Sequence, residues 1–306
     1  MITSGQFGDI NQVRGYWQAF NKEYDDSSAG DIGWVNKVAL KESLNQATAR
    51  YTAFHGVGRM QVASETQTVT QDVLIEGYDS SKTPTVFSNG LIIGRLARDN
   101  AQDPWNVLKD HARMFVTGKN DTISYQCASA LNSAHTTTAP DGQYIFSATH
   151  PIEDASGTWS NMTSAQLSYS SLKDMLTSFQ FVPNGRGAYK TQKPGVLLVP
   201  TAEKYNAMNI LGADAPGTTD RDMNVLKAEG LEIVTSPYLS SSKICFLFTK
   251  DKNPMSYPLR WIEHTPFEYD VTEDKDYVGG ALKLSAYMVM AFHVAYLRGL
   301  HSLYSV

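Results

Sequence analysis

The chain has 306 residues, of which 42% are hydrophobic, 11% aromatic and only 19% charged. The aromatic content and a formal net charge of −5 exclude a predominantly disordered chain, and 26 basic against 31 acidic residues exclude a histone-like binder of polyanions. Because soluble domains carry about 25% charged residues on average, the composition predicts a globular protein with little charged surface, as expected where partners cover much of it.

The first third of the sequence predicts, in order, a polar arm, a helix and a β-ribbon. Residues 1–33 are polar and predict an arm that lies on something else. A helix is predicted from Trp34 to about Arg50, because apolar residues recur there at a spacing near 3.6. Residues 76–84 have the composition of a turn or loop tip. They divide three predicted strands, Val57–Val62, Thr66–Ile75 and Val86–Ile93. A ribbon with so polar a surface is marginal alone and should pack against another element.

The middle of the chain predicts helices. Asp103 as a cap and Pro104 in the first helical position indicate a helix start. Two apolar stripes continue to Leu131, as one kinked helix or two in series, about 40 Å long in total. A strand is predicted over Gln143–Ala148 and a helix over Leu167–Phe179.

The second half predicts a mixture of strands and helices. The run Val196–Val199 suits a strand that is buried on both faces. The other predicted elements are a helix over Ala202–Leu211, a loop over Gly212–Asn224, and strands over Leu231–Val234, Ile244–Thr249, Leu259–Val271 and Gly280–Val294. The predicted fold class is α+β.

The cysteine usage and the lack of a secretory signal pattern predict an intracellular protein. Cys127 and Cys245 are far apart and fit no zinc or redox motif, so two free thiols are expected. Met1–Tyr16 lacks the pattern of a secretory signal. The most apolar stretch, Ala281–Leu297, is short and interrupted by a lysine and a histidine, so no membrane span is expected.

Motifs for catalysis are mostly absent. There is no G-x-S-x-G elbow, phosphate-binding loop or H-E-x-x-H, and residues 56–58 lack the third glycine of a dinucleotide site. His150 is the one histidine in a turn-rich setting beside acidic residues, Glu153 and Asp154. This setting suits His150 as a general base or a metal ligand, but a turn histidine that satisfies backbone groups is several times more common.

Two further groups of charged residues have the composition of an ion-binding site. An acidic run could bind a divalent cation, but it lacks the ligand spacing of an EF-hand loop, which favours a solvated strand edge and loop. It comprises Glu263-His264, Glu268, Asp270, Glu273, Asp274 and Asp276. The one local basic group is equally suited to acidic neighbours or to phosphate. It comprises Arg95, Arg98, Lys109 and Arg113. We therefore predict no catalytic, cofactor-binding or metal-binding residues.

Several stretches together resemble a known family. Residues 141–151 (DGQYIFSATHP), the turn 157–161 and residues 167–172 (LSYSSL) resemble the Mu-type major head subunit of tailed bacteriophages. The order of elements in the second half is similar to major capsid proteins with the Hong Kong 97 bacteriophage fold. These elements are Pro194–Pro200, a helix ending Asn209–Leu211, Gly230–Leu239 and Cys245–Phe248. The resemblance extends from about Trp34 to the C-terminus.

The resemblance implies an architecture and a function. It implies an N-terminal arm (1–33), a helix with an extended β-ribbon loop (34–94), a peripheral domain with a long spine helix (95–171 and 256–306) and an axial domain (172–255). The chain would be a structural major capsid protein. Copies of it, arranged as hexamers and pentamers, would form an icosahedral or prolate shell around double-stranded phage DNA.

The resemblance also implies partners. These are further copies of the chain, a portal, a separate scaffolding protein since the chain has no room for a fused one, decoration proteins, and packaged DNA in weak, non-specific contact. No cofactor and no membrane partner are expected. The protein would be assembled in the host bacterial cytoplasm and reside in the virion.

Alternatives stay open beside this interpretation. Some members of the family cross-link a loop lysine to an asparagine, and Lys82 is the only lysine of the ribbon, but nothing identifies its partner and the bond is not predicted. An encapsulin-like cellular nanocompartment shell would share the fold. A cytosolic hydrolase using His150 with Glu153 or Asp154 is the alternative from another functional class.

Overall fold

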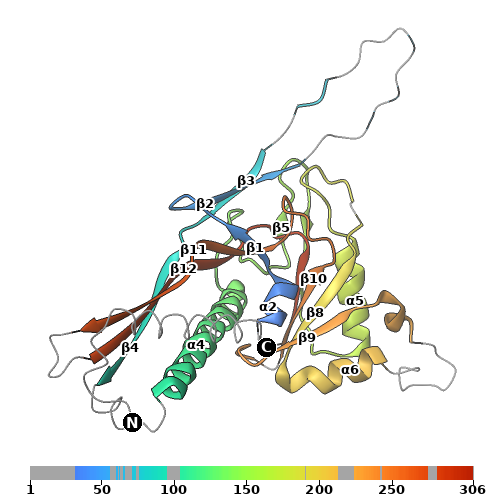
Figure 1. The fold of residues 1–306 in the computed structure, drawn as a ribbon. Helices are drawn as coiled ribbons and strands as arrows, with labels where there is room; N and C mark the ends of the chain where they lie inside the picture. The colour runs from blue at the N-terminus through green and yellow to red at the C-terminus, as the bar shows by residue number, and fades with distance from the viewer. Residues whose placement is uncertain are drawn as a thin grey trace.

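The computed structural model describes residues 32–55, 60, 62, 65, 71–73, 76–94, 104–189, 191–212, 224–241, 243–274 and 281–305. In these ranges a four-stranded and a five-stranded β-sheet pack with helices into a body, and a two-stranded sheet formed by residues 49–54 and 76–82 projects from it (Figure 1). The predicted arm, apart from its last two residues, lies outside the described residues. None of the helices within these ranges combines the length and apolarity that a membrane crossing needs.

The chain becomes extended soon after the first described helix. Helix α2 covers only Gly33–Val38 and is followed by strands β1 (Leu40–Ser43) and β2 (Ala49–Phe54). The helix predicted up to Arg50 is therefore wrong beyond Val38. Strand β1 pairs in parallel with β11 and alternates half-buried and exposed side chains. The apolar spacing fitted a helix, but this pairing satisfies the backbone in a strand instead.

A two-stranded ribbon projects from the body. Strand β3 (Glu76–Lys82) pairs antiparallel with β2, and only two residues separate it from β4 (Thr85–Gly94). The turn predicted over residues 76–84 is therefore wrong over residues 76–82, where cross-strand pairing with β2 overrides a turn-like composition, and only residues 83–84 form a connection. The strand predicted over Val86–Ile93 is confirmed by β4. The strands predicted over Val57–Val62 and Thr66–Ile75 lie largely outside the described residues.

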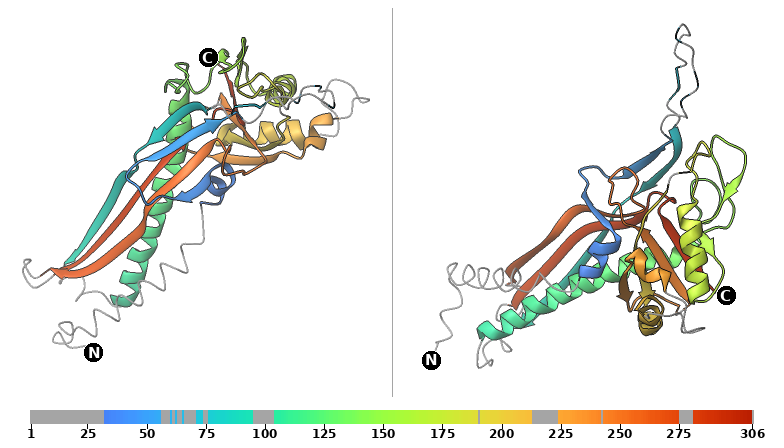
Figure 2. Two further views of the ribbon diagram at one scale, coloured as in Figure 1. Left: turned by 90° about the horizontal axis from the view of Figure 1, so that it is seen from above. Right: turned by 90° about the vertical axis from the view of Figure 1, so that its right-hand side faces the viewer.

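The first sheet is long and lies along the longest helix. Its order is β1-β11-β12-β4, with β11 (Leu259–Asp274) and β12 (Ala281–Val294) antiparallel to each other and β4 antiparallel to β12. Helix α4 (Pro104–Asn132) follows one face of it (Figure 2), where Phe115 and Val116 pack against Leu284 and Ala286. The helix start at Pro104 and the strands β11 and β12 are confirmed. The helix is continuous, and its predicted cap Asp103 lies outside the described residues.

The second sheet is covered on both faces. Its order is β7-β13-β10-β8-β9. The strands are β7 (Met162–Thr163), β13 (Leu300–Tyr304), β10 (Ile244–Thr249), β8 (Pro194–Pro200) and β9 (Glu232–Ser236). Helices α5 (Tyr169–Gln180) and α6 (Lys204–Gly212) pack on the face that carries Leu197. The face with Leu198 packs on α2 and the end of α4. The predicted doubly buried strand and both helices are confirmed, whereas β13 was not predicted.

A loop-rich segment connects α4 to α5. It contains the 3-10 turn η2 (Ser133–His135) and the short strands β5 (His150–Pro151) and β6 (Thr158–Trp159). The strand predicted over Gln143–Ala148 is wrong, because this segment makes only an isolated bridge, between Thr138 and Tyr144. Ile145 and Phe146 are buried in succession, and the side chain of Asn161 satisfies the Ile145 carbonyl. Two more 3-10 turns, η3 (Thr201–Glu203) and η4 (Val225–Glu229), flank α6.

Both cysteines are free and buried. Burial raises the pKa of the Cys127 thiol far above its ordinary value and that of Cys245 to about 12. Both therefore remain protonated thiols at neutral pH, without nucleophilic character.

Candidate functional site

His150 lies at the centre of a buried polar cluster. Its ring is fully buried and stacks on Trp159 with 4.7 Å between the ring centroids. The Nδ1 atom lies 2.6 Å from Oδ2 of Asp141, and the Nε2 atom lies 3.1 Å from Oδ1 of Asn161. Both ring nitrogens are therefore engaged by side chains rather than by backbone groups.

The hydrogen bonds of Asn161 determine which atoms carry hydrogen. Its Nδ2 donates to the Ile145 carbonyl at 2.7 Å, and its Oδ1 accepts from the Ser147 amide at 2.9 Å. Because Oδ1 is an acceptor, Nε2 of His150 must donate to it. A second proton then lies between His150 and the Asp141 carboxyl group. The cluster is thus a fully bonded structural network that joins the loop after α4 to β5 and β7.

This geometry excludes the dyad considered from the sequence. A general base needs a nitrogen within reach of a substrate proton, and both nitrogens of His150 are buried and bonded. Asp154 is exposed, and Glu153 is bonded to Arg298. The alternative pairing of His150 with Glu153 or Asp154 is therefore not formed, because the loop places Asp141 and Asn161 against the ring.

Glu153 and Arg298 tie three segments together. Arg298 donates from Nη1 and Nη2 to the two carboxylate oxygens of Glu153 at 3.1 and 2.6 Å, and from Nε to the Pro183 carbonyl at 2.8 Å. Burial opposes ionisation of Glu153, but the hydrogen bond and charge of Arg298 outweigh it, so the pKa of Glu153 lies below its ordinary value. Nε2 of His55, just after β2, lies 3.8 Å from the same carboxylate.

A cavity of about 220 Å³ adjoins this ion pair at the base of the projecting ribbon. Aromatic, charged and apolar side chains line it, among them His55, Tyr78, Trp159, Met255, Tyr296 and Arg298. No group of three His, Cys, Asp or Glu side chains within the described ranges is arranged to hold a metal ion. The lining therefore offers packing surface and one ion pair rather than a set of ligands.

The predicted acidic run lies along β11. Glu263 pairs with Lys41 at 2.9 Å, and the exposed His264 has its Nδ1 3.0 Å from Oγ1 of Thr265. Glu268 and Asp270 are exposed on the strand, Glu273 and Asp274 belong to its end, and Asp276 lies outside the described residues. The described side chains of the run are therefore spread along one strand, where Glu268 and Asp270 face solvent.

The predicted basic group is not assembled in the described part of the chain. Arg113 contacts Asp110 at 3.3 Å on the exposed side of α4, whereas Lys109 is described only as part of the helix backbone. Arg95, Arg98 and the residues 56–58 lie outside the described residues. Lys82 is exposed at the body end of β3, opposite Ala49, rather than at the outer end of the ribbon.

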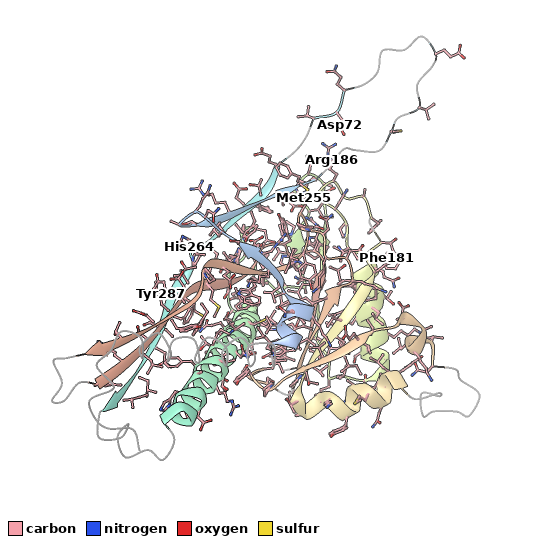
Figure 3. The ribbon with its side chains drawn as sticks, viewed as in Figure 1. Asp72, Phe181, Arg186, Met255, His264 and Tyr287 are labelled. Atoms are coloured by element: carbon pink, nitrogen blue, oxygen red, sulfur yellow. The ribbon has the colours of Figure 1, made fainter. Side chains whose placement is uncertain are left out.

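The face of the first sheet opposite α4 carries exposed apolar side chains. Val86 and Ile92 on β4 are 56% and 48% exposed. Tyr287 on β12, labelled in Figure 3, is 41% exposed. Strand β4 is also one of the two edges of this sheet among the described strands, with β1 at the other. Apolar side chains along a projecting edge are typical of a surface that another protein covers. We call these three residues the outer sheet face. Val86 and Ile92 fall within the strand predicted over Val86–Ile93, but no local pattern shows which side of that strand stays exposed.

Comparison with known proteins gives a family and a fold. A family model described as phage capsid protein matches residues 78–301. No curated protein matches the sequence significantly. Similar solved structures include the capsid of cyanophage P-SCSP1u (TM-score 0.57, 10% identity, covering 89% of this chain and 88% of that one). The procapsid of bacteriophage JBD30 has a TM-score of 0.53 at 12% identity, covering 96% and 75%. A virus-like particle from Pyrococcus furiosus has a TM-score of 0.53 at 8% identity, covering 92% and 96%.

Proposed function

The chain belongs to the phage capsid protein family, and on this premise we propose that its copies assemble into a closed icosahedral or prolate shell around double-stranded DNA. It is a structural major capsid protein with the α+β fold of tailed-phage capsids. The family resemblance seen in the sequence is thereby confirmed. The observation that carries the proposal is the family match over residues 78–301.

The division into arm, ribbon, peripheral domain and axial domain remains part of this proposal. Helix α4 with the long sheet would form the peripheral domain, and the five-stranded sheet with α5 and α6 the axial domain. Strands β7 and β13 belong by residue number to the peripheral domain but pair into the five-stranded sheet. The two domains would therefore share that sheet and move as one body.

The capsid identity implies association of the chain with copies of itself in a shell lattice. In a closed symmetric lattice each contact is repeated many times, so individually weak interfaces sum to a stable shell. We propose hexamers and pentamers as the units, with the outer sheet face and the ribbon among the contacts. Uncharged polar and apolar groups suit such contacts because they avoid the cost of desolvating charges.

Other partners are proposed from the same premise. A portal, a separate scaffolding protein and decoration proteins would complete the shell. The near balance of basic and acidic residues supports weak, non-specific contact with packaged DNA, since a strongly basic wall would bind DNA tightly. The protein is a virion component, and we propose that it assembles in the host bacterial cytoplasm.

We also propose that the chain has no catalytic, cofactor-binding or metal site. The engaged nitrogens of His150 support this for the one candidate that the sequence offered. The phage capsid family match favours a virion shell over a cellular nanocompartment, although the fold is shared with the virus-like particle.

Self-association should depend on the outer sheet face. In sedimentation velocity at physiological salt, the unaltered protein should sediment mainly as large assemblies. The double variant Ile92→Glu with Tyr287→Glu should lower the assembled fraction by about tenfold or more, because it places two charges where apolar groups would be buried.

The matched control is Ile92→Val with Tyr287→Phe, which keeps the face apolar and should assemble normally. Unchanged assembly of the Glu variant would remove the outer sheet face from the interface. A strictly monomeric unaltered protein would contradict the shell itself.

A further inference from the structure

A short loop between α5 and β8 is held rigidly by its own hydrogen bonds. In residues 183–189, which we call the clamp loop, Asn184 Oδ1 accepts from the amides of Arg186 and Ala188 at 3.0 and 2.9 Å. The Asn184 amide donates to the Ala188 carbonyl at 2.8 Å, and Gly187 adopts φ = +76°, which favours glycine. The loop is thus a preformed turn that presents Gly185 and Arg186 toward the ribbon.

The clamp loop contacts the ribbon at the end of β2, through His55, the residue that follows this strand. The side chain of His55 fits between Gly185 of the loop and Gly77 of β3. A Cβ atom at Gly185 would lie 2.1 Å from the imidazole ring, and one at Gly77 would lie 2.5 Å from it. Both glycines are therefore needed to admit the ring, which is only 6% exposed.

The same loop also contacts the ribbon just before β3, at Asp72 and Val73. Arg186 Nη1 lies 2.8 Å from both carboxylate oxygens of Asp72, and its Nη2 donates to the Val73 carbonyl. Only 14% of the Arg186 side chain is exposed, so this charge-assisted contact is partly shielded from solvent. Figure 3 places Asp72 and Arg186 close together at the outer end of β2 and β3.

The loop is in turn fastened to the core of the body. Arg298 donates to the Pro183 carbonyl at 2.8 Å and is fixed by its ion pair with Glu153. One rigid turn thereby connects both of these places in the ribbon to the connection between β12 and β13. The two contacts between the clamp loop and the ribbon differ in chemistry. The His55 ring packs against Gly185, whereas Arg186 forms an ion pair with Asp72.

We propose that the clamp loop is a positioning element that sets the direction in which the ribbon leaves the body. This inference rests on the proposed function, in which the ribbon reaches a neighbouring copy. A closed lattice of hexamers and pentamers repeats closely similar contacts in every copy, so the direction of the ribbon must vary only within narrow limits. Holding the ribbon in its bound direction before assembly also lowers the entropy cost of forming each contact.

The test combines hydrogen exchange with particle shape. In Arg186→Ala, amides of β3 should exchange about fivefold faster than in the unaltered protein, the loss expected for one charge-assisted contact. Exchange in β11 should be unchanged. Assembled material should change from uniform shells to open or irregular ones. Arg113→Ala removes an exposed arginine contact on α4 and should change neither measurement.

Two further variants test the same contacts in case Arg186→Ala also disturbs the fold of the clamp loop. Charge exchange, Asp72→Arg with Arg186→Asp, should bring β3 exchange back to within about twofold of the unaltered protein, whereas each single change should not. Gly185→Ala should expel the His55 ring and loosen the ribbon at the end of β2 instead.

Each outcome bears on one proposal. Unchanged β3 exchange in Arg186→Ala and Gly185→Ala would overturn the clamp. Faster exchange with fully normal shells would overturn its positioning role. Failure of the unaltered protein to form shells would contradict the proposed function instead, while the exchange measurement would still test whether the loop holds the ribbon.

Discussion

Acidification from pH 7 to pH 5 should lower the free energy of unfolding of the dissociated subunit by about 2 kcal/mol through His301 alone. His301 is buried in β13, and burial lowers its pKa from 6.5 to about 4. An unfolded histidine binds a proton near its ordinary pKa, whereas the folded one does not until about pH 4. Stability is therefore fully present above pH 6.5 and is lost as the pH falls toward 4.

Two other histidines act in the same direction. Burial lowers the pKa of His135 to about 4, and its ring lies between Phe146 and Tyr304 with centroids 4.8 and 4.7 Å away. Burial, together with the charge of Lys82, lowers the pKa of His293 to about 4. Both are less buried than His301, so each should contribute less. Glu153, whose ordinary pKa is 4.5, stays ionised at pH 5 because Arg298 lowers its pKa further.

Urea unfolding at pH 7 and pH 5 measures this effect. His301→Gln keeps a side chain that can bond to Thr163, the present partner of His301 at 2.9 Å, but removes the titration. It should reduce the pH-dependent loss by about 2 kcal/mol. His264→Gln alters an exposed histidine and should leave the loss unchanged. Equal stability of the unaltered subunit at the two pH values would contradict the burial of these three rings.

Asp141→Ala should destabilise the subunit by about 1–3 kcal/mol, the cost of leaving a buried polar group without its hydrogen-bond partner. The Asp141 side chain is 2% exposed and its Oδ2 lies 2.6 Å from Nδ1 of His150. Without it, Nδ1 of the fully buried His150 ring has lost its only hydrogen-bond partner, while Asn161 still holds Nε2. Thermal or urea unfolding measures the loss.

Two variants make this result specific. Asp154→Ala removes an exposed carboxylate of the same region and should change stability by less than about 0.5 kcal/mol. Asp141→Asn keeps an acceptor for Nδ1 and should cost less than Asp141→Ala. A loss below about 1 kcal/mol in Asp141→Ala would show that the buried cluster is not a structural joint.

Long elements with strong periodicity were predictable from the sequence. Strands β11 and β12 alternate over more than a dozen residues each, and α4 begins at a proline, so local pattern and tertiary structure agree. The errors arose where strand pairing decided the structure. Residues 40–50 satisfy a helical spacing, but residues 40–43 pair with β11 and residues 49–50 with β3; residues 76–82 resemble a turn but pair with β2.

The candidate site was predictable only in part, because its contacts are distant in sequence. His150 stood out through its setting, but its partner is Asp141 rather than the nearer Glu153. The sequence Asn184-Gly185-Arg186-Gly187 carried a usable signal, since two glycines around an arginine indicate a tight turn that presents a basic side chain. Nothing local connects that turn to Asp72, which lies 114 residues away.

Electron microscopy of the purified, unaltered protein at physiological salt tests the central claim most directly. The account predicts uniform closed shells, round or prolate, whose reconstruction shows the long sheet and the ribbon in contact with neighbouring copies. A preparation that contains only single subunits, or only irregular aggregates at every concentration, would contradict it.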